Sequence, residues 1–122
     1  MLQFEIDLNK YLNDIYKETN LSDKVYNTEL PLNFDFSNNI GIYFAVNSVD
    51  DGSYKNVFSI DIHFYSTDIN KINLLKIIEI FDKNLNKKNI SNYWITHKNV
   101  YCISLKEEDL YHSILSYNVN KY

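Results

Sequence analysis

The residues able to carry nucleophilic chemistry are few in this 122-residue chain. A thiol or hydroxyl nucleophile needs a base beside it and a group that orients the base. Cys102 is the only cysteine, and His97 and His112 are the conceivable bases. Cys102 sits inside an alternating apolar run, which favours a small core residue over a reactive thiol. The chain also has no G-x-S-x-G motif and only two glycines, which excludes a glycine-rich phosphate loop.

Metal and acid–base chemistry have equally weak signals. The three histidines, His63, His97 and His112, share no ligand spacing, so we expect structural histidines and no metal site. A divalent-metal nuclease would need acids on a strand near a lysine, a role that Asp61, Glu79 and Lys76 could be forced into. That arrangement fits many α+β sequences by chance, and it stands as a third hypothesis. We therefore predict a protein that is not an enzyme, with no catalytic, cofactor-binding or metal-binding residues and no cofactor.

The stretch from residue 57 to residue 88 carries the clearest structural pattern. Its first half alternates apolar and polar residues, the period of a strand with one buried face. Its second half changes to the helical period, with one apolar stripe. The stripe consists of Leu74, Ile77, Ile78, Phe81 and Leu85. Thr67 or Asp68 can cap the start of this helix, and Lys83, Lys87 and Lys88 suit its end.

The remaining elements follow from the same periodicities. We predict an amphipathic helix over 3–18, a short strand over 24–27, an antiparallel hairpin of 40–48 with 55–65, and strands over 93–97, 100–105 and 110–119. Lys98-Asn99 is the predicted turn between the first two of the last three strands. These elements predict a single α+β domain over 1–122, with a mostly antiparallel or mixed sheet, the N-terminal and central helices packed on one face, and a protruding hairpin.

Charge and composition limit the partners. The net charge is −4, the twelve basic residues are all lysines, and arginine is absent, which argues against specific nucleic-acid binding. The N-terminus lacks the basic region of a signal peptide, and no apolar run approaches the about 20 residues that span a bilayer. We expect a soluble protein made in the cytoplasm that does not bind membranes.

Tyrosine is abundant, with eleven copies, and this residue is enriched both at interfaces and in strands. The candidate interface anchors are Tyr43, Tyr54, Tyr65, Tyr93, Trp94 and Tyr101. The alternative is that half of them fill the core, with Trp94 the most buried.

The order of these elements resembles a family of phage structural proteins. The resemblance is carried by the helix ending LNDIYKETNLSDKVY, the proline in TELPLNF, the hairpin IGIYFAVNSVDDGSYKNVFSIDIHFYS, the helix INKINLLKIIEIFDKNLNKK and the closing strand YHSILSYNVNKY. The family is that of phage tail terminator, or tail completion, proteins, which also occur as collar components of contractile bacteriocin particles. This chain departs from the family in having less glycine around the hairpin and no arginine.

The resemblance implies a structural role without catalysis. The chain would form a ring, typically six-fold, that caps the head-proximal end of a phage-like tail tube and joins it to the neck or sheath. Its partners would be further copies of itself and the tail tube and sheath proteins, its location would be the tail of a virion or phage-like particle, and DNA could pass through the ring. A closed ring uses two different faces of each subunit. The residues expected at those contacts are Asp50, Asp51, Gly52, Tyr54, Glu107, Glu108 and Asp109.

A second class of function fits the same composition. A small acidic protein-binding module, such as an immunity or inhibitor protein, would also be tyrosine-rich and lack an active site. Assembly separates the two hypotheses, because an inhibitor is expected to be a monomer or dimer and a terminator is expected to form rings.

Overall fold

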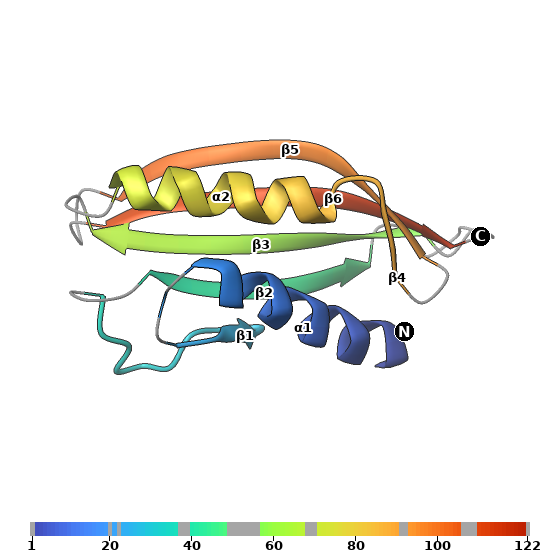
Figure 1. Cartoon of the computed structure of the whole chain (residues 1–122), viewed down its shortest axis with the longest axis horizontal. Coiled ribbons are helices and arrows are strands. Elements are labelled where there is room, and N and C mark those ends of the chain that lie inside the picture. The colour runs from blue at the N-terminus through green and yellow to red at the C-terminus, as the bar shows by residue number, and fades with distance from the viewer. Residues whose placement is uncertain are drawn as a thin grey trace.

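The computed structural model describes residues 2–19, 21, 23–36, 40–48, 57–67, 71–90, 93–105 and 110–121. The predicted contact residues lie outside this described set: Asp50, Asp51, Gly52, Tyr54, Glu107, Glu108 and Asp109. The elements in chain order are α1 (Leu2–Tyr16), a 3-10 turn (Lys17–Thr19), β1 (Val25–Asn27), β2 (Gly41–Ser48), β3 (Val57–Thr67), α2 (Lys71–Leu85), β4 (Lys88–Ile90), β5 (Tyr93–Leu105) and β6 (Leu110–Lys121). Figure 1 shows both helices in front of the sheet, on the same face.

The sheet has six strands in the order β1-β2-β3-β6-β5-β4. Strand β1 runs parallel to β2, and every other pairing is antiparallel. The predicted hairpin is confirmed, with Ile42 opposite Phe64 and Ser48 opposite Phe58. The last strand inserts between β3 and β5, so the chain's C-terminal segment lies at the centre of the sheet. The fold is thus the α+β class with a mixed sheet that the sequence predicts.

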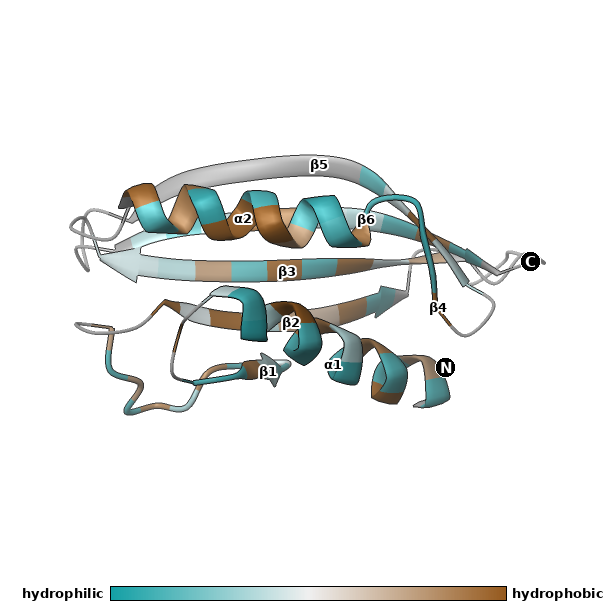
Figure 2. Ribbon diagram, viewed as in Figure 1, coloured by the Kyte–Doolittle hydropathy of each residue, from teal (hydrophilic) through white to brown (hydrophobic). Residues whose placement is uncertain are grey.

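A single apolar core lies between the sheet and the helices. Phe58, Ile60, Ile62 and Phe64 of β3 are all buried, and Figure 2 shows the brown and teal bands that alternate along this strand. The buried stripe of α2 matches the predicted one: Leu74, Ile77, Ile78, Phe81 and Leu85. Burying such side chains stabilises the fold by roughly 1.5–3 kcal/mol each.

Helix α1 is tied to the edge of the sheet by one side chain. The Asn13 Oδ1 accepts a hydrogen bond from the Val25 backbone N–H at 2.9 Å, and the Asn13 Nδ2 donates to the Val25 carbonyl at 3.5 Å. The amide therefore stands where the next strand's backbone would stand, on the outer side of β1. Covering an edge strand in this way removes a surface on which other chains could pair.

Two details of the strand assignment differ from the prediction. Residues 93–105 form one continuous strand, with a β-bulge between His97 and Asn99 where a turn was expected. The bulge inserts one residue, which lets both halves of β5 keep pairing with β6. Strand β4 was not expected at all: Lys87, at φ 63°, donates its N–H to the Ile95 carbonyl at 2.8 Å and turns the chain back along β5.

Candidate functional site

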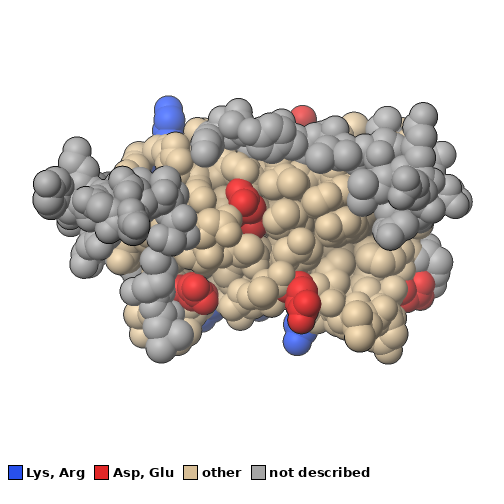
Figure 3. Space-filling view, turned by 180° about the vertical axis from the view of Figure 1, so that it is seen from behind, with Lys and Arg blue, Asp and Glu red and all other residues tan. Residues whose placement is uncertain are grey.

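The face of the sheet that the helices leave uncovered is the candidate functional surface. Alternation along β3 sends Asp61, His63 and Tyr65 to this face while their neighbours enter the core. Figure 3, seen from behind, shows that the described part of the face is mostly uncharged, with isolated acidic groups and lysines at its margins. Such a surface suits contact with another protein better than contact with a charged polymer.

Four aromatic rings stack at the centre of this face. Tyr43 lies over His63, with ring centroids 4.5 Å apart and planes at 5°. Tyr65 lies over His112 at 4.2 Å and 10°. Both stacks follow from strand register, because Tyr43 is directly opposite His63 and Tyr65 is directly opposite His112. Directly opposed side chains are the closest neighbours across a sheet and stabilise the strand pairing.

The two imidazoles also touch each other. His63 Nδ1 lies 2.8 Å from His112 Nε2, so the rings meet edge to edge and one nitrogen donates to the other. Both rings cannot carry a proton on the facing nitrogens, because two N–H groups would then point at each other. Burial lowers the pKa of His63, although nearby Asp61 opposes this. Burial and the neighbouring His63 lower the pKa of His112 to about 4.

The sequence predicts structural histidines without a ligand spacing, and it does not predict that His63 and His112 touch. His63 and His112 are 49 positions apart and meet only because β6 pairs with β3. No spacing in the sequence predicts this contact, because it depends on the register in which β6 pairs with β3. Within the described part of the chain, no group of three or more His, Cys, Asp or Glu side chains is arranged to hold a metal ion.

Asp61 extends the polar centre of the face across three strands. Its carboxylate accepts a hydrogen bond from the Ser116 Oγ at 2.6 Å and another from the Asn47 Nδ2 at 2.8 Å. Glu79, the partner proposed for a nuclease site, is exposed on α2. Asp61 and Glu79 therefore lie on opposite sides of the sheet, and the structure does not bring these two carboxylates together.

The remaining histidine belongs to a network under α2. Asp82 Oδ1 accepts a hydrogen bond from the Tyr117 hydroxyl at 2.7 Å and lies 2.9 Å from His97 Nδ1. A Tyr–Asp–His set resembles acid–base machinery, but Tyr117 is 0% exposed. Burial, and then the hydrogen bond to Asp82, raises the pKa of Tyr117 far above its usual range. This network fastens α2 to β6 and β5, and only its tyrosine is closed to solvent, because the side chains of His97 and Asp82 are 32% and 36% exposed.

Some of the aromatic residues that were predicted as interface anchors pack against other residues of the same chain. Tyr43, Tyr65, Tyr93 and Trp94 are all half-buried. Tyr93 packs on Phe4 with ring centroids 4.9 Å apart, so it closes the core near the start of α1. Tyr43 and Tyr65 remain on the helix-free face, and the side chains of Tyr54, Tyr101 and Cys102 lie outside the described set.

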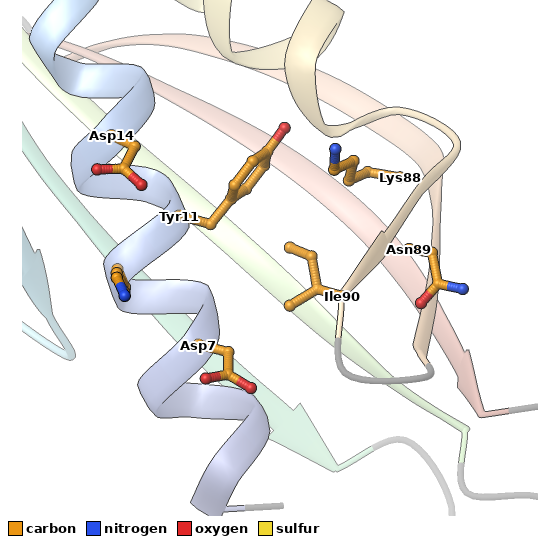
Figure 4. A pocket seen from close by; sticks show the side chains of 7 residues that line it. Asp7, Tyr11, Asp14, Lys88, Asn89 and Ile90 are labelled. Carbon is orange, nitrogen blue, oxygen red and sulfur yellow. The ribbon is translucent and has the colours of Figure 1, made fainter.

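A pocket of about 350 Å³ lies between α1 and β4. Figure 4 shows Asp7, Tyr11 and Asp14 on α1 facing Lys88 and Ile90 across it. Tyr11 is already engaged, because its hydroxyl donates to the Asn84 carbonyl at 2.8 Å and the Lys88 Nζ lies 5.1 Å from its ring centroid. The residues that line the pocket include both aspartates and lysines, so the charge of the lining does not indicate one class of ligand.

Comparison with known proteins finds likeness in fold among solved structures. No protein-family model matches the sequence, and no curated protein matches it. Among solved structures, the chain is similar to one from the virion of a native gene transfer agent particle, with a TM-score of 0.55 and 11% sequence identity. The match covers 89% of this chain and 82% of that chain. At this identity the likeness establishes a shared architecture over most of both lengths. No helix among the described residues has the length and apolarity to cross a membrane.

Proposed function

We propose that this chain is a structural subunit of a phage-like particle, and that it acts as a tail terminator. The supporting observation is the fold it shares with a chain of a gene transfer agent virion over 89% of its own length. In this role the protein assembles with other particle proteins and is located in the particle.

The terminator role makes a specific demand on assembly. Copies of the chain form a hexameric ring that binds the head-proximal end of the tail tube and stops its growth. The mostly uncharged, aromatic face around Tyr43 and Tyr65 suits burial against another protein. The hairpin tip and the 106–109 connection stay predicted contact regions.

The test is assembly with the tube. The purified chain is examined by size-exclusion chromatography with light scattering, alone and with the tail-tube protein of the same particle, and the mixtures are imaged by electron microscopy. We expect rings at one end of tubes whose length no longer increases. A chain that stays monomeric in both conditions contradicts the proposal, and a tight one-to-one complex with an enzyme would favour the immunity-type alternative.

The proposal also holds that the protein is not an enzyme. With Mg²⁺ or Mn²⁺ present, we expect no cleavage of single- or double-stranded DNA or RNA by the wild-type chain. The matched control is the Asp61→Ala/Glu79→Ala double variant. Cleavage by the wild type that disappears in the double variant would establish the nuclease hypothesis instead.

A further inference from the structure

The two outer edges of the sheet are each covered along only part of their length. Strand β1 pairs with Ile42–Phe44 of β2, and β4 pairs with Tyr93–Ile95 of β5. Among the described residues, no strand pairs with the outer side of Ala45–Ser48 or of Asn99–Leu105. Open edges of this kind are templates for pairing with another chain.

Alternation identifies the backbone groups on the open part of β2. Thr28 donates its N–H to the Phe44 carbonyl at 2.8 Å, so the even-numbered residues of β2 point their backbone groups away from β3. Val46 and Ser48 continue this set beyond the end of β1. Their N–H and C=O groups lie along the open edge.

The same reasoning applies to β5, with one correction. The His97 N–H points outward, because it donates to the Asn86 side chain at 2.9 Å. The bulge between His97 and Asn99 adds a residue and reverses the alternation. The outward backbone groups beyond it are therefore those of Val100, Cys102 and Ser104.

The open parts of β2 and β5 are complementary in direction and position. Three antiparallel pairings separate the two strands, so β2 and β5 run in opposite directions. A second copy placed beside the first in the same orientation thus sets its β2 antiparallel to β5. Strand β1 pairs with the first half of β2 and β4 with the first half of β5, so on these oppositely directed strands the two short strands lie towards opposite ends. A shift along the strands lets the two open halves overlap while β1 and β4 lie beyond the overlap.

The open part of β5 lacks the residues that usually protect an edge strand from pairing with other chains. Natural edges are commonly protected by charged residues or proline, yet the stretch NVYCISL over 99–105 contains neither. The outer side of β1, in contrast, is closed by the side chain of Asn13. Asn13 thus covers the outer side of β1, whereas no described strand covers the backbone of residues 99–105, a stretch without charged side chains.

We propose that β5 of one copy pairs antiparallel with β2 of the next copy, so that neighbouring sheets join into one continuous sheet. This inference rests on the proposed ring, for which it supplies the heterologous contact that closed cyclic assembly requires. The shift between copies inclines the strands to the ring axis, as the stagger of strands does in closed barrels.

Proline substitution at the two edges tests the contact. Ser104→Pro and Ser48→Pro each remove one outward N–H without touching a bond within the sheet, and Ser104→Ala and Ser48→Ala are the matched controls that keep it. We expect both alanine variants to assemble like the wild type and both proline variants to be monomeric, with cooperative thermal unfolding retained. An equimolar mixture of the two proline variants should yield dimers, because one intact β5 edge meets one intact β2 edge.

The outcomes separate this inference from the proposed function. If the wild type forms rings and the proline variants do so equally well, the edge contact is wrong and the ring stands. If Ser48→Pro assembles normally and only Ser104→Pro fails, β5 pairs with itself and the inference is again overturned. A wild type that remains monomeric with and without tube protein overturns both.

Cross-linking gives a second readout that does not depend on proline. With Cys102 replaced by serine, Asn47→Cys adds a thiol at an exposed position of β2 and Ile103→Cys adds a thiol to β5, and assembled protein is treated with a short bis-maleimide. Head-to-tail pairing should give a ladder of dimers, trimers and larger species on a denaturing gel. Either cysteine alone should give no ladder, and a product of the double-cysteine variant that is confined to dimers contradicts the inference.

Discussion

The two imidazoles on the helix-free face make folding sensitive to mild acid. The unfolded-state pKa of histidine is about 6.5, and the folded-state pKa values of His63 and His112 are lower, the latter about 4. Between these values the unfolded chain binds more protons than the folded chain. The contribution of these two histidines to the free energy of unfolding is therefore largest above pH 6.5 and falls as the pH drops towards 4. Partial solvent exposure limits the contribution of His112 to the order of 1 kcal/mol.

Urea unfolding at pH 7 and pH 5 measures this effect. We expect His112→Phe, which keeps an aromatic ring beside Tyr65 but has no titrating group, to lose less stability over this interval than the wild type. Tyr65→Phe is the control, because it retains both imidazoles and should keep the wild-type pH dependence. If the free energy of unfolding changes equally with pH in the wild type and in His112→Phe, the His63–His112 pair does not titrate between pH 5 and pH 7.

Gly41, on the helix-free face, has no room for a larger side chain because neighbouring side chains crowd it. A Cβ at this position would lie 2.6 Å from the Leu30 Cδ1 and 3.1 Å from the Phe36 Cε1. We expect Gly41→Ala to destabilise the fold by about 1–2 kcal/mol through overpacking. The Leu30 side-chain end is the nearest obstacle, so Gly41→Ala should be less damaging when combined with Leu30→Ala. Additive effects in this double-mutant cycle would place the strain elsewhere.

At the scale of elements, the attachment of α1 to β1 depends on Asn13. Replacing it with leucine removes both hydrogen bonds to the Val25 backbone and should destabilise the protein by about 1–3 kcal/mol. Asn13→Asp keeps the acceptor for the Val25 N–H and should be intermediate. Amide hydrogen exchange gives the direct readout: the Val25 amide should lose protection in Asn13→Leu and keep it in Asn13→Asp. Retained protection in the leucine variant would contradict the assignment.

The elements themselves were largely readable from the sequence, and their long-range partners were not. The alternation of β3 and the stripe of α2 reflect a core that each segment faces directly, so local periodicity predicts both. The continuity of β5 was missed because a bulge at His97 and a turn at Lys98-Asn99 look alike without the paired strand. The His63–His112 contact was missed for the same reason, since it exists only in the register between β3 and β6.

At the scale of the whole molecule, three surfaces of the sheet lie outside the core: the helix-free face, the open part of β2 and the open part of β5. The helices cover one face completely enough that Phe44, Ile62 and Leu115 are 0% exposed, while the other face carries stacked rings and a carboxylate network. A protein that works by association needs such a division between a stable interior and available surfaces. Sequence composition anticipates the division only through its tyrosine content, because placement on a face depends on strand register.

The charge of the whole chain leads to a final prediction about DNA. Affinity for duplex DNA comes mainly from cations that neutralise phosphates, and this chain has a net charge of −4 and no arginine. We expect the anisotropy of a labelled duplex to stay unchanged on addition of the protein at physiological salt. The Asp7→Lys/Asp14→Lys variant should bind weakly at low salt, because each substitution replaces a negative charge with a positive one and the two together bring the net charge from −4 to zero. Salt-sensitive binding by the wild type would contradict a ring through which DNA passes without adhering.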